Sequence, residues 1–445
     1  MPVWRIAVPV AAADLPNRPG AQQRRPRPLL RLRRLVPLLV LLPWLQGCTP
    51  TETQGQGTTS QGTVSQGADG PSSERPRAEA ITIWAENLQL DLGGNTTKQA
   101  DGLENQIQEY RRINPEATIV LQRLSTEALL QRLTLRAKQG LAPDLVLIRP
   151  RHLALLARNG TLRPFLLPAQ RRTLYRPALL RLAQQRGQVA DPDGAARLEA
   201  LPYLLYTYLS CYNRERLPQP PTTLDAFIEA GAGGARLAMG GTLELLDWME
   251  PSFAGDRTAF LAWVQRANLE RSISFVETDR QLGLGLLTNR FDWIPCSSAW
   301  LPVLRQRLGE RLGVAPLPAG PAGPARPYLR GRVWGFINQS SPGQQQLADD
   351  FALFSTNPVQ QRNLSLNLLS GLPVNANLPL PFSGYPELAA MQTSLLSSRW
   401  LNAQQVDDLL GTSRQFQPTL NRVITGSMTP AEGARLLQTL KPQPQ

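Results

Sequence analysis

The chain has 445 residues but only one histidine, His152. A hydrolytic triad needs a histidine as its base, and no G-x-S-x-G elbow lies near His152. The chain also lacks the G-x-x-x-x-G-K-[ST] phosphate loop and the glycine fingerprint of dinucleotide-binding folds. We therefore assign no catalytic residue and expect no cofactor.

Cysteine is also scarce, with Cys48, Cys211 and Cys296 alone. None lies in a C-x-x-C pair, and one histidine cannot complete a common zinc set, so no metal site is predicted. Cys211 and Cys296 each end a strand-like run. In an exported chain they can form a disulfide; the alternative is two small, buried apolar side chains.

The formal net charge of +13 has no concentrated source in the body of the chain. Residues 1–47 contain eight Arg and one acidic residue, and the remainder contains 39 basic and 33 acidic residues with no Lys/Arg run longer than two. A nucleic-acid-binding protein gathers basic charge on one surface. We therefore expect no nucleic-acid partner.

The N-terminal apolar run is too short to cross a membrane. Basic residues 24–34 precede the 11 apolar residues 35–45, against the ~30 Å thickness of a hydrocarbon core. This arrangement is typical of a secretory signal. It ends in "LQGC", where Gly47–Cys48 resembles the bacterial lipobox, so residues 1–47 are predicted to be a lipoprotein signal peptide and Cys48 the lipidated residue. The alternatives are a plain signal peptide or an anchor helix, each with an incidental cysteine.

Residues 48–80 are rich in Thr, Gln, Gly and Ser and contain no large apolar side chain except Val64. Such a segment buries too little surface to offset its chain entropy, so it is predicted to be a disordered tether. A lipid followed by a tether predicts an exported protein anchored to the cell membrane, facing the periplasm or the cell exterior.

From residue 81 onward, short apolar runs alternate with helical patterns, which favours an α/β fold. Capping residues mark several helix starts: Ser125 or Thr126, Ser341, Asn357, and Thr429 with Glu432 in a capping box. The predicted strands are 81–85, 117–124, 144–148, 201–213, 313–318 and 331–338, with another near 290–296 before a turn and a helix. The predicted helices include 101–114, 125–140, 151–160, 222–231, 256–268, 341–355, 357–369 and 429–440.

Several of these segments carry motifs of a known family. "ITIWA" (81–85), "EYRRINPEATIVLQRL" (109–124), "AKQGLAPDLVLI" (137–148) and "LPYLLYTYLSCYN" (201–213) occur in order, followed by "CSSAWLP" (296–302), "SGLPVN" (370–375) and "VITGSMTPAEGARLLQTL" (423–440). The series resembles the extracellular solute-binding proteins of ABC sugar importers, the maltose-binding-protein-like group, over residues 81 to about 440. Cys296 with the serine pair, and Arg332, depart from the usual pattern.

The resemblance implies a two-lobed, type II periplasmic-binding-protein fold with three crossing segments and a ligand cleft between the lobes. Lobe one would be 81–200 and 319–366, and lobe two 207–313 and 373–445. It also implies a monomer that captures a sugar or related polyhydroxylated solute and delivers it to an ABC permease with its ATPase subunits. Two alternatives stay open: a lipid-anchored carbohydrate-active enzyme, and a solute sensor without a transport role.

Sugars present apolar faces that stack on aromatic rings and hydroxyls that bind polar groups. The expected ligand-binding residues therefore lie at strand ends near the cleft. They are Trp84, Glu86, Arg149, Arg151, Tyr206, Trp248, Trp300 and Trp334. Tyr208 is an alternative to Tyr206, and Trp263, in a helical stripe, is assigned to the core.

Arg149 and Arg151 follow the predicted strand 144–148 directly. Fixed guanidinium groups there would favour an acidic or highly hydroxylated solute; the alternative is a solvated loop pair. His152 is predicted to open the next helix without a catalytic partner. For the enzyme alternative, the candidate carboxylates are Glu86, Asp144, Glu244, Asp247 and Asp292, none placed by the sequence at a fixed separation.

Overall fold

A computed structural model of the chain describes residues 80–87, 102–183 and 196–440. The predicted signal peptide, the lipidation residue Cys48 and the predicted tether up to residue 79 lie outside these residues.

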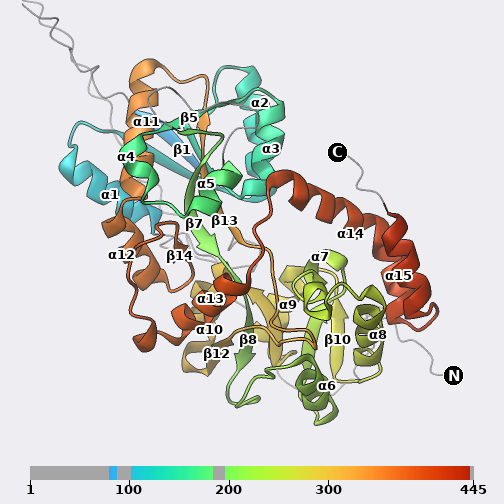
Figure 1. The fold of residues 1–445 in the computed structure, drawn as a ribbon. Coiled ribbons are helices and arrows are strands. Elements are labelled where there is room, and N and C mark those ends of the chain that lie inside the picture. Colours follow the sequence, from blue (N-terminus) through green and yellow to red (C-terminus); the bar gives the residue numbers. More distant parts are fainter. Residues whose placement is uncertain (1–79, 88–101, 184–195, 441–445) are drawn as a thin grey trace, which may run out of the picture. The chain divides into compact units, whose positions relative to one another are not determined.

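Within the described residues, the larger sheet has seven strands (Figure 1). In spatial order they are β14 (Leu372–Pro373), β7 (Leu201–Tyr206), β13 (Arg330–Ile337), β3 (Leu145–Ile148), β1 (Ile81–Glu86) and β2 (Ile119–Leu124), with β4 (Leu162–Arg163) beside β13. Strands β1, β2 and β3 run parallel, and β13 runs antiparallel to β3 and β7. The parallel strands therefore end at one edge of the sheet, beside the start of β13.

A second sheet in the described residues has five strands, in the order β10 (Ile273–Val276), β9 (Leu237–Gly240), β11 (Trp293–Ser297), β8 (Tyr208–Asn213) and β12 (Leu312–Ala315). Strands β9, β10 and β11 are parallel, and β8 is antiparallel to β11 and β12. A two-stranded ribbon joins β5 (Phe165–Leu167) to β6 (Ala196–Leu198).

Helices pack around both sheets. Those of the larger sheet are α1 (Leu103–Ile113), α2 (Thr126–Lys138), α3 (Pro150–Arg158), α5 (Pro177–Ala183), α11 (Pro342–Ser355) and α12 (Pro358–Leu368), with the short α4 (Ala169–Arg172) before α5. Those of the smaller sheet are α6 (Leu224–Ala232), α7 (Leu243–Leu246), α8 (Arg257–Ala267), α9 (Asp279–Leu287), α10 (Leu301–Leu308) and α13 (Pro386–Ser397), followed by α14 (Ala403–Ile424) and α15 (Pro430–Thr439).

The predicted helix caps are confirmed. The Ser125 side chain accepts a hydrogen bond from the Ala128 amide, and Ser341 caps α11 in a capping box with Gln344. Asn357 caps α12, and Thr429 caps α15. Each cap satisfies an amide that has no partner inside its helix, which is why these helices begin where the sequence predicts.

The predicted single strand 201–213 is two strands. Strand β7 belongs to the larger sheet and β8 to the smaller, and Thr207 lies between them (Figure 1). Thr207 is held by Ser298, whose hydroxyl accepts from the Thr207 amide at 3.2 Å and whose amide donates to the Thr207 carbonyl at 2.9 Å. Because one buried apolar run supplies both strands, the periodicity of the run does not reveal the change of sheet.

The chain crosses between the sheets twice more in the described residues. It returns from β12 to β13, and it leaves β14 for α13. These are the three crossing segments of the two-lobed fold, and the ends of the strands at the crossings border the space between the sheets.

Candidate functional site

A cavity of about 1120 Å³ is lined by elements of both sheets. From the larger sheet come the start of α3, the ends of β7 and the start of β13; from the smaller come the starts of α7 and α9 and the turn after β11. Since parallel strands point their carboxyl ends toward this space, the loops that follow them supply its polar side chains.

Four of the predicted ligand-binding residues line this cavity: Arg149, Arg151, Tyr206 and Trp300. Arg149 and Arg151 flank Pro150, the first residue of α3. Tyr206 is the last residue of β7, and Trp300 ends the single helical turn Ser298–Trp300 after β11. The sequence signal for Arg149, Arg151 and Trp300 was a polar or aromatic residue shortly after a buried strand, whereas Tyr206 was chosen as an aromatic residue in the first crossing segment.

Three predicted tryptophans lie in the hydrophobic core instead of lining the cavity. Trp334 is fully buried, donates its indole N–H to Ser355 at 2.9 Å and contacts Tyr203 and Phe351 edge-on. Trp248 belongs to the core of the smaller sheet, and Trp84 packs with the residues under α2. These indoles fill the layer between sheet and helices, which takes most large side chains in a closely packed protein. Trp263 lies in the core, as predicted.

Glu86 does not line the cavity but lies behind Arg149. Its carboxylate is 1% exposed and accepts hydrogen bonds from the Arg149 backbone amide at 3.0 Å and the Arg149 Nε at 2.8 Å. The Thr126 hydroxyl donates to the same carboxylate. Arg149 is thus paired with a buried carboxylate, and this pairing ties the start of α3 to the end of β1.

His152 connects this buried pair to Arg151. Arg151 Nε donates to His152 Nε2 at 3.2 Å, and His152 Nδ1 lies 3.6 Å from Glu86. Burial lowers the pKa of His152, more than Glu86 raises it, so the ring is neutral with its proton on Nδ1. Burial alone would raise the pKa of Glu86, but the contact with His152 and the charge of Arg149 hold that pKa well below its ordinary value.

Several cavity residues were missed from the sequence, chief among them Arg330 at the start of β13. Its guanidinium carbon lies over the rings of Tyr208 and Tyr328, 4.7 and 4.8 Å from their centroids. Asp279, at the start of α9, lies 3.4 Å from it and accepts from the Tyr208 hydroxyl at 2.5 Å. The basic residues around Gly331 were the available signal, but spacing alone does not say which of them faces the cavity.

Arg332 and Glu244 also belong to the charged lining, which further includes Glu199, Glu277, Arg280 and Arg414. Arg332 is 2% exposed, and its Nη2 donates to the backbone carbonyls of Glu86 and Leu147, which ties β13 to the ends of β1 and β3. Glu244, on α7, lies 3.7 Å from Arg151. Arginines from the larger sheet therefore meet carboxylates from the smaller sheet across the cavity.

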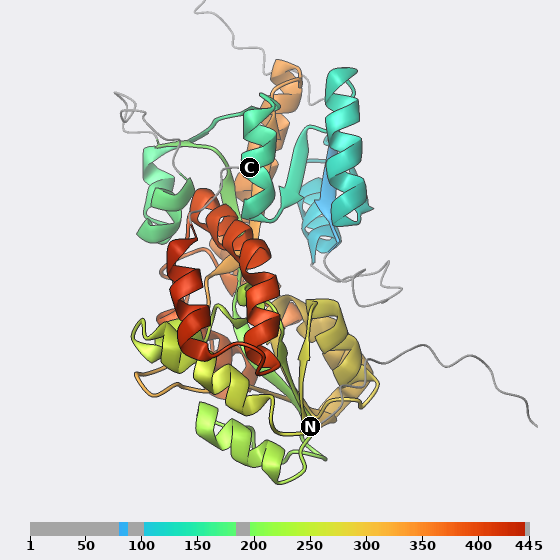
Figure 2. The same cartoon turned by 90° about the vertical axis from the view of Figure 1, so that its right-hand side faces the viewer.

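Helix α14 forms one wall of the cavity. Asn402, its N-cap, and residues spaced three or four positions apart along it line the cavity, namely Val406, Leu410, Ser413 and Gln417. The helix contacts α7 and α8 on one side and α3 on the other. In Figure 2 this red C-terminal segment faces the viewer. Because residues three or four positions apart lie on one face of a helix, α14 presents a single stripe of polar and apolar side chains to the cavity.

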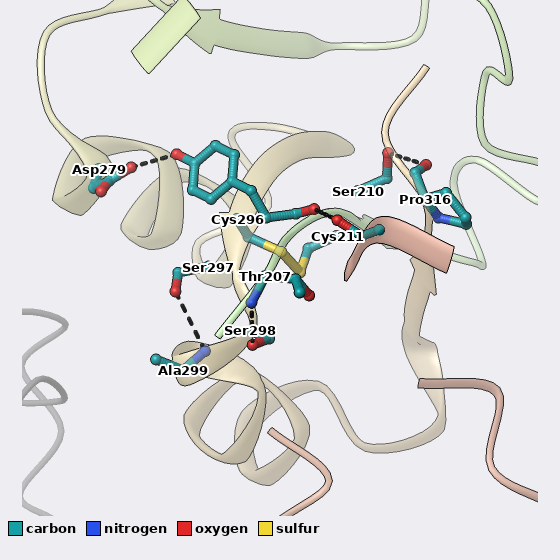
Figure 3. Close-up of a disulfide and its surroundings, with 11 residues drawn as sticks. Thr207, Ser210, Cys211, Asp279, Cys296, Ser297, Ser298, Ala299 and Pro316 are labelled. Carbon is teal, nitrogen blue, oxygen red and sulfur yellow. Dashed lines mark hydrogen bonds between the residues drawn. A yellow bond between two sulfur atoms is a disulfide. The ribbon is translucent and has the colours of Figure 1, made fainter. Parts of the chain in front are cut away.

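Cys211 and Cys296 are joined by a disulfide, with their Cα atoms 5.9 Å apart (Figure 3). Cys211 pairs with Ile294 and Cys296 with Leu209 across β8 and β11, so the cysteines lie diagonally on one face of the antiparallel pair. Both are fully buried. The bond lies directly behind the Thr207–Ser298 crossing and Ser297, which lines the cavity.

Besides Glu86, three of the carboxylates considered for hydrolysis have structural partners. Asp144 accepts from the Thr82 amide at 2.7 Å and from Ser340 at 2.6 Å. Asp292 pairs with two arginines, one of them Arg236 at 2.7 Å, and Asp247 pairs with Arg399. These contacts occupy the carboxylates in holding loops together and leave them outside the cavity lining.

Across the described residues no group of three or more His, Cys, Asp or Glu side chains is arranged to hold a metal ion. Likewise, none of the helices found in those residues combines the length and apolarity needed to cross a membrane.

Comparison with known proteins places these features in context. Residues 105–395 match the sequence profile of a family described as "Bacterial extracellular solute-binding protein". A search of curated proteins gives no significant sequence match.

Solved structures with the same fold cover 81% of this chain. The GacH receptor of Streptomyces glaucescens, studied with acarbose, matches with a TM-score of 0.64 at 15% identity over 99% of its own chain. Maltose-bound MalE3 of T. maritima matches with a TM-score of 0.62 at 18% identity over 100% of its own chain. The maltodextrin-binding protein MalE1 of L. casei matches with a TM-score of 0.62 at 16% identity over 97% of its own chain.

Proposed function

The chain belongs to the bacterial extracellular solute-binding proteins, and from this premise we propose that it captures a carbohydrate or related polyhydroxylated solute for an ABC importer. As a member of that family it is an exported binding protein and not an enzyme. The proposed partners are a membrane permease and the ATPase subunits that power it, and the protein acts as a monomer.

The observation that carries the proposal is the cavity lined from both sheets, with three aromatic residues (Tyr206, Trp300 and Tyr328) and a set of charged groups lining it. Trp300 and Tyr206 offer ring surface for a sugar's C–H face, while Arg151 and Glu244 offer a donor group and an acceptor group for hydroxyls. Structures of similar fold were solved with acarbose and maltose, which agrees with a solute of this class.

The two lobes are assigned as lobe one, 81–200 and 319–366, and lobe two, 207–313 and 373–445. The membership of most strands in the two sheets supports this division; the exceptions are β7 and β14, which belong to the larger sheet but lie at the crossings, outside the bounds of lobe one. Closing of the lobes about the three crossing segments would enclose the solute, as in other hinge-bending proteins.

Lipid attachment at Cys48 would hold the protein at the membrane beside its permease. Replacing Cys48 with Ala should move the protein from the membrane fraction to the soluble fraction of the producing cell, and mass spectrometry of the wild-type N-terminus should find acylated Cys48. An unmodified N-terminus at another residue would overturn the anchor and leave the binding function standing.

Solute capture is tested with purified residues 80–445. A thermal-shift screen against mono- and disaccharides, glycosides of glycerol and sugar acids should raise the melting temperature with the true solute, since a ligand that binds only the folded state stabilises it by mass action. Fluorescence titration then gives the affinity. Absence of any shift across the panel at millimolar concentration contradicts the proposal.

A further inference from the structure

Two arginines in the cavity have most of their hydrogen-bond donors unfilled. A guanidinium carries five N–H donors. Among the described residues Arg151 uses only its Nε, on His152, because Glu244 at 3.7 Å is beyond hydrogen-bond distance. Arg330 makes one hydrogen bond, to Asp279 at 3.4 Å. Both side chains line the cavity, so the unfilled donors are available to whatever enters it.

These guanidinium groups are held in place. Arg330 contacts the rings of both Tyr208 and Tyr328, and His152, itself in contact with buried Glu86, orients Arg151. Preorganised donors lose little freedom on binding, which strengthens recognition of a planar or tetrahedral oxyanion. Tyr328 also lines the cavity, and its phenol, protonated at neutral pH, can act as a further donor.

The carboxylates opposite make long contacts with these arginines, although Asp279 also accepts a short hydrogen bond from the Tyr208 hydroxyl. Glu244 and Asp279 approach their arginines at 3.7 and 3.4 Å and are 26% and 30% exposed. By comparison, the nitrogen–oxygen distance in the structural ion pair between Arg236 and Asp292 is 2.7 Å. Burial lowers the pKa of Arg151, with Arg149 adding to the effect. A solute anion that makes short hydrogen bonds can compete with Glu244 and Asp279 for the two arginines, because both carboxylates approach them only at long distances.

We propose that Arg151, Arg330 and Tyr328 form an anion-recognition site, so that the solute is a polyhydroxylated compound bearing a carboxylate or phosphate. This inference rests on the proposed function and narrows its solute class. Arg149, which the sequence grouped with Arg151, is not part of the site because Glu86 engages it.

The test compares matched neutral and anionic probes by calorimetry on residues 80–445. The pairs are glucose with glucuronate, galactose with galacturonate, maltose with maltobionate, cellobiose with cellobionate, and glucose with glucose 6-phosphate. The anionic member of at least one pair should bind roughly ten- to a hundredfold more tightly, the range that hydrogen bonds to a charged group supply. Comparing the affinities of the sugar acids with that of glucose 6-phosphate identifies whether a carboxylate or a phosphate is recognised.

Variants then assign the preference to the arginines. Arg151→Gln, at a partly exposed position, should reduce the anionic preference, that is, the ratio of the anionic to the neutral affinity, about tenfold or more. Arg330→Lys keeps the positive charge but loses the paired N–H donors of the guanidinium, so it should also reduce the anionic preference. Arg307→Gln, an exposed arginine on α10, is the matched control and should leave both affinities unchanged.

The possible results distinguish failure of the anion-recognition site from failure of the proposed solute-binding function. Equal affinity for neutral and anionic members overturns the anion site and leaves sugar binding intact. An anionic preference that survives both Arg151→Gln and Arg330→Lys overturns the assignment to these residues. No binding by any probe, neutral or anionic, contradicts the proposed function itself.

Discussion

Trp300 is the aromatic side chain best placed to contact a sugar, because it lines the cavity at the end of β11. Trp300→Ala should weaken binding of the solute by about 1 to 3 kcal/mol, as for a stacked aromatic anchor. Trp300 is only 6% exposed and also packs on the core, so the substitution will lower stability as well. Calorimetry on folded protein measures the affinity.

Two further variants separate packing from binding. Trp300→Phe keeps most of the packing and a smaller ring, so its affinity should fall between those of wild type and Trp300→Ala. Trp263→Phe, in the core of the smaller sheet, should lower the melting temperature but not the affinity. Wild-type affinity in Trp300→Ala would remove Trp300 from the site.

Glu86 is a buried anion whose role is to fix Arg149 and His152. Glu86→Gln leaves Arg149 without its counter-charge, and removing one partner of a buried ion pair costs about 3 to 5 kcal/mol. The lower end applies because Arg149 stays 25% exposed. Denaturant unfolding at pH 7 measures the change, with Glu109→Gln, in an exposed pair with Arg112, as a control expected to change little.

The pH dependence of this effect has a definite sign. Folding lowers the pKa of Glu86 below its ordinary value of 4.5, so its stabilisation is fully present above that pH and is lost as the pH falls toward the folded pKa. The stability difference between wild type and Glu86→Gln should therefore shrink below about pH 4.5. A constant difference from pH 7 to pH 3 would contradict this role.

At the scale of single residues, the sequence predicted position better than orientation. Arg151 and Trp300 follow buried strands and line the cavity. Trp334 is also in a strand near the cleft, but its ring turns into the core. Whether a strand residue points to the cleft or to the helix layer depends on the sheet's register with its neighbours, which a local pattern does not contain.

At the scale of elements, the disulfide joins β8 and β11 beneath the first crossing segment. It closes a separation of 85 residues, and constraining a loop of that size in the unfolded chain contributes about 4 to 5 kcal/mol in the entropic description. The variant Cys211→Ala/Cys296→Ala should therefore melt at a lower temperature. Dithiothreitol should lower the melting temperature of wild type to that of the variant and leave the variant unchanged.

A free-thiol assay on the denatured, unreduced wild-type protein provides the independent readout. Detection of two free thiols, together with identical melting temperatures for wild type and variant, would contradict the bond. The sequence alone left these cysteines as a bonded pair or two apolar residues, because nothing local indicates that strands from residues 208–213 and 293–297 are neighbours.

The elements themselves were largely predictable. Strands β1, β2 and β3 and the capped helices α2, α11, α12 and α15 follow from short apolar runs and from local hydrogen bonds at helix ends. The division of residues 201–213 at Thr207 was not predictable, because it depends on a hydrogen bond between Thr207 and Ser298, which is 91 residues away in the sequence.

At the scale of the whole molecule, two ion pairs span the cavity. Arg330 with Asp279 and Arg151 with Glu244 each join a residue of the larger sheet's side to one of the smaller sheet's side. Partly exposed pairs contribute about 0.2 to 1 kcal/mol each. Together they would bias the empty protein toward a closed arrangement by roughly 0.4 to 2 kcal/mol, a population factor of about 2 to 30.

Neutralising the two carboxylates should release this bias. The variant Glu244→Gln/Asp279→Asn, without solute, should have a larger radius of gyration than wild type in small-angle X-ray scattering, and addition of solute should bring the two closer. Asp225→Asn is the control, because its pair with Arg266 lies within the smaller sheet's side of the molecule. High salt should expand wild type more than the double variant, since it screens the pairs that the variant lacks. Equal radii for wild type and double variant in low salt would show that these pairs do not hold the cavity closed, and closure would then depend on the solute alone.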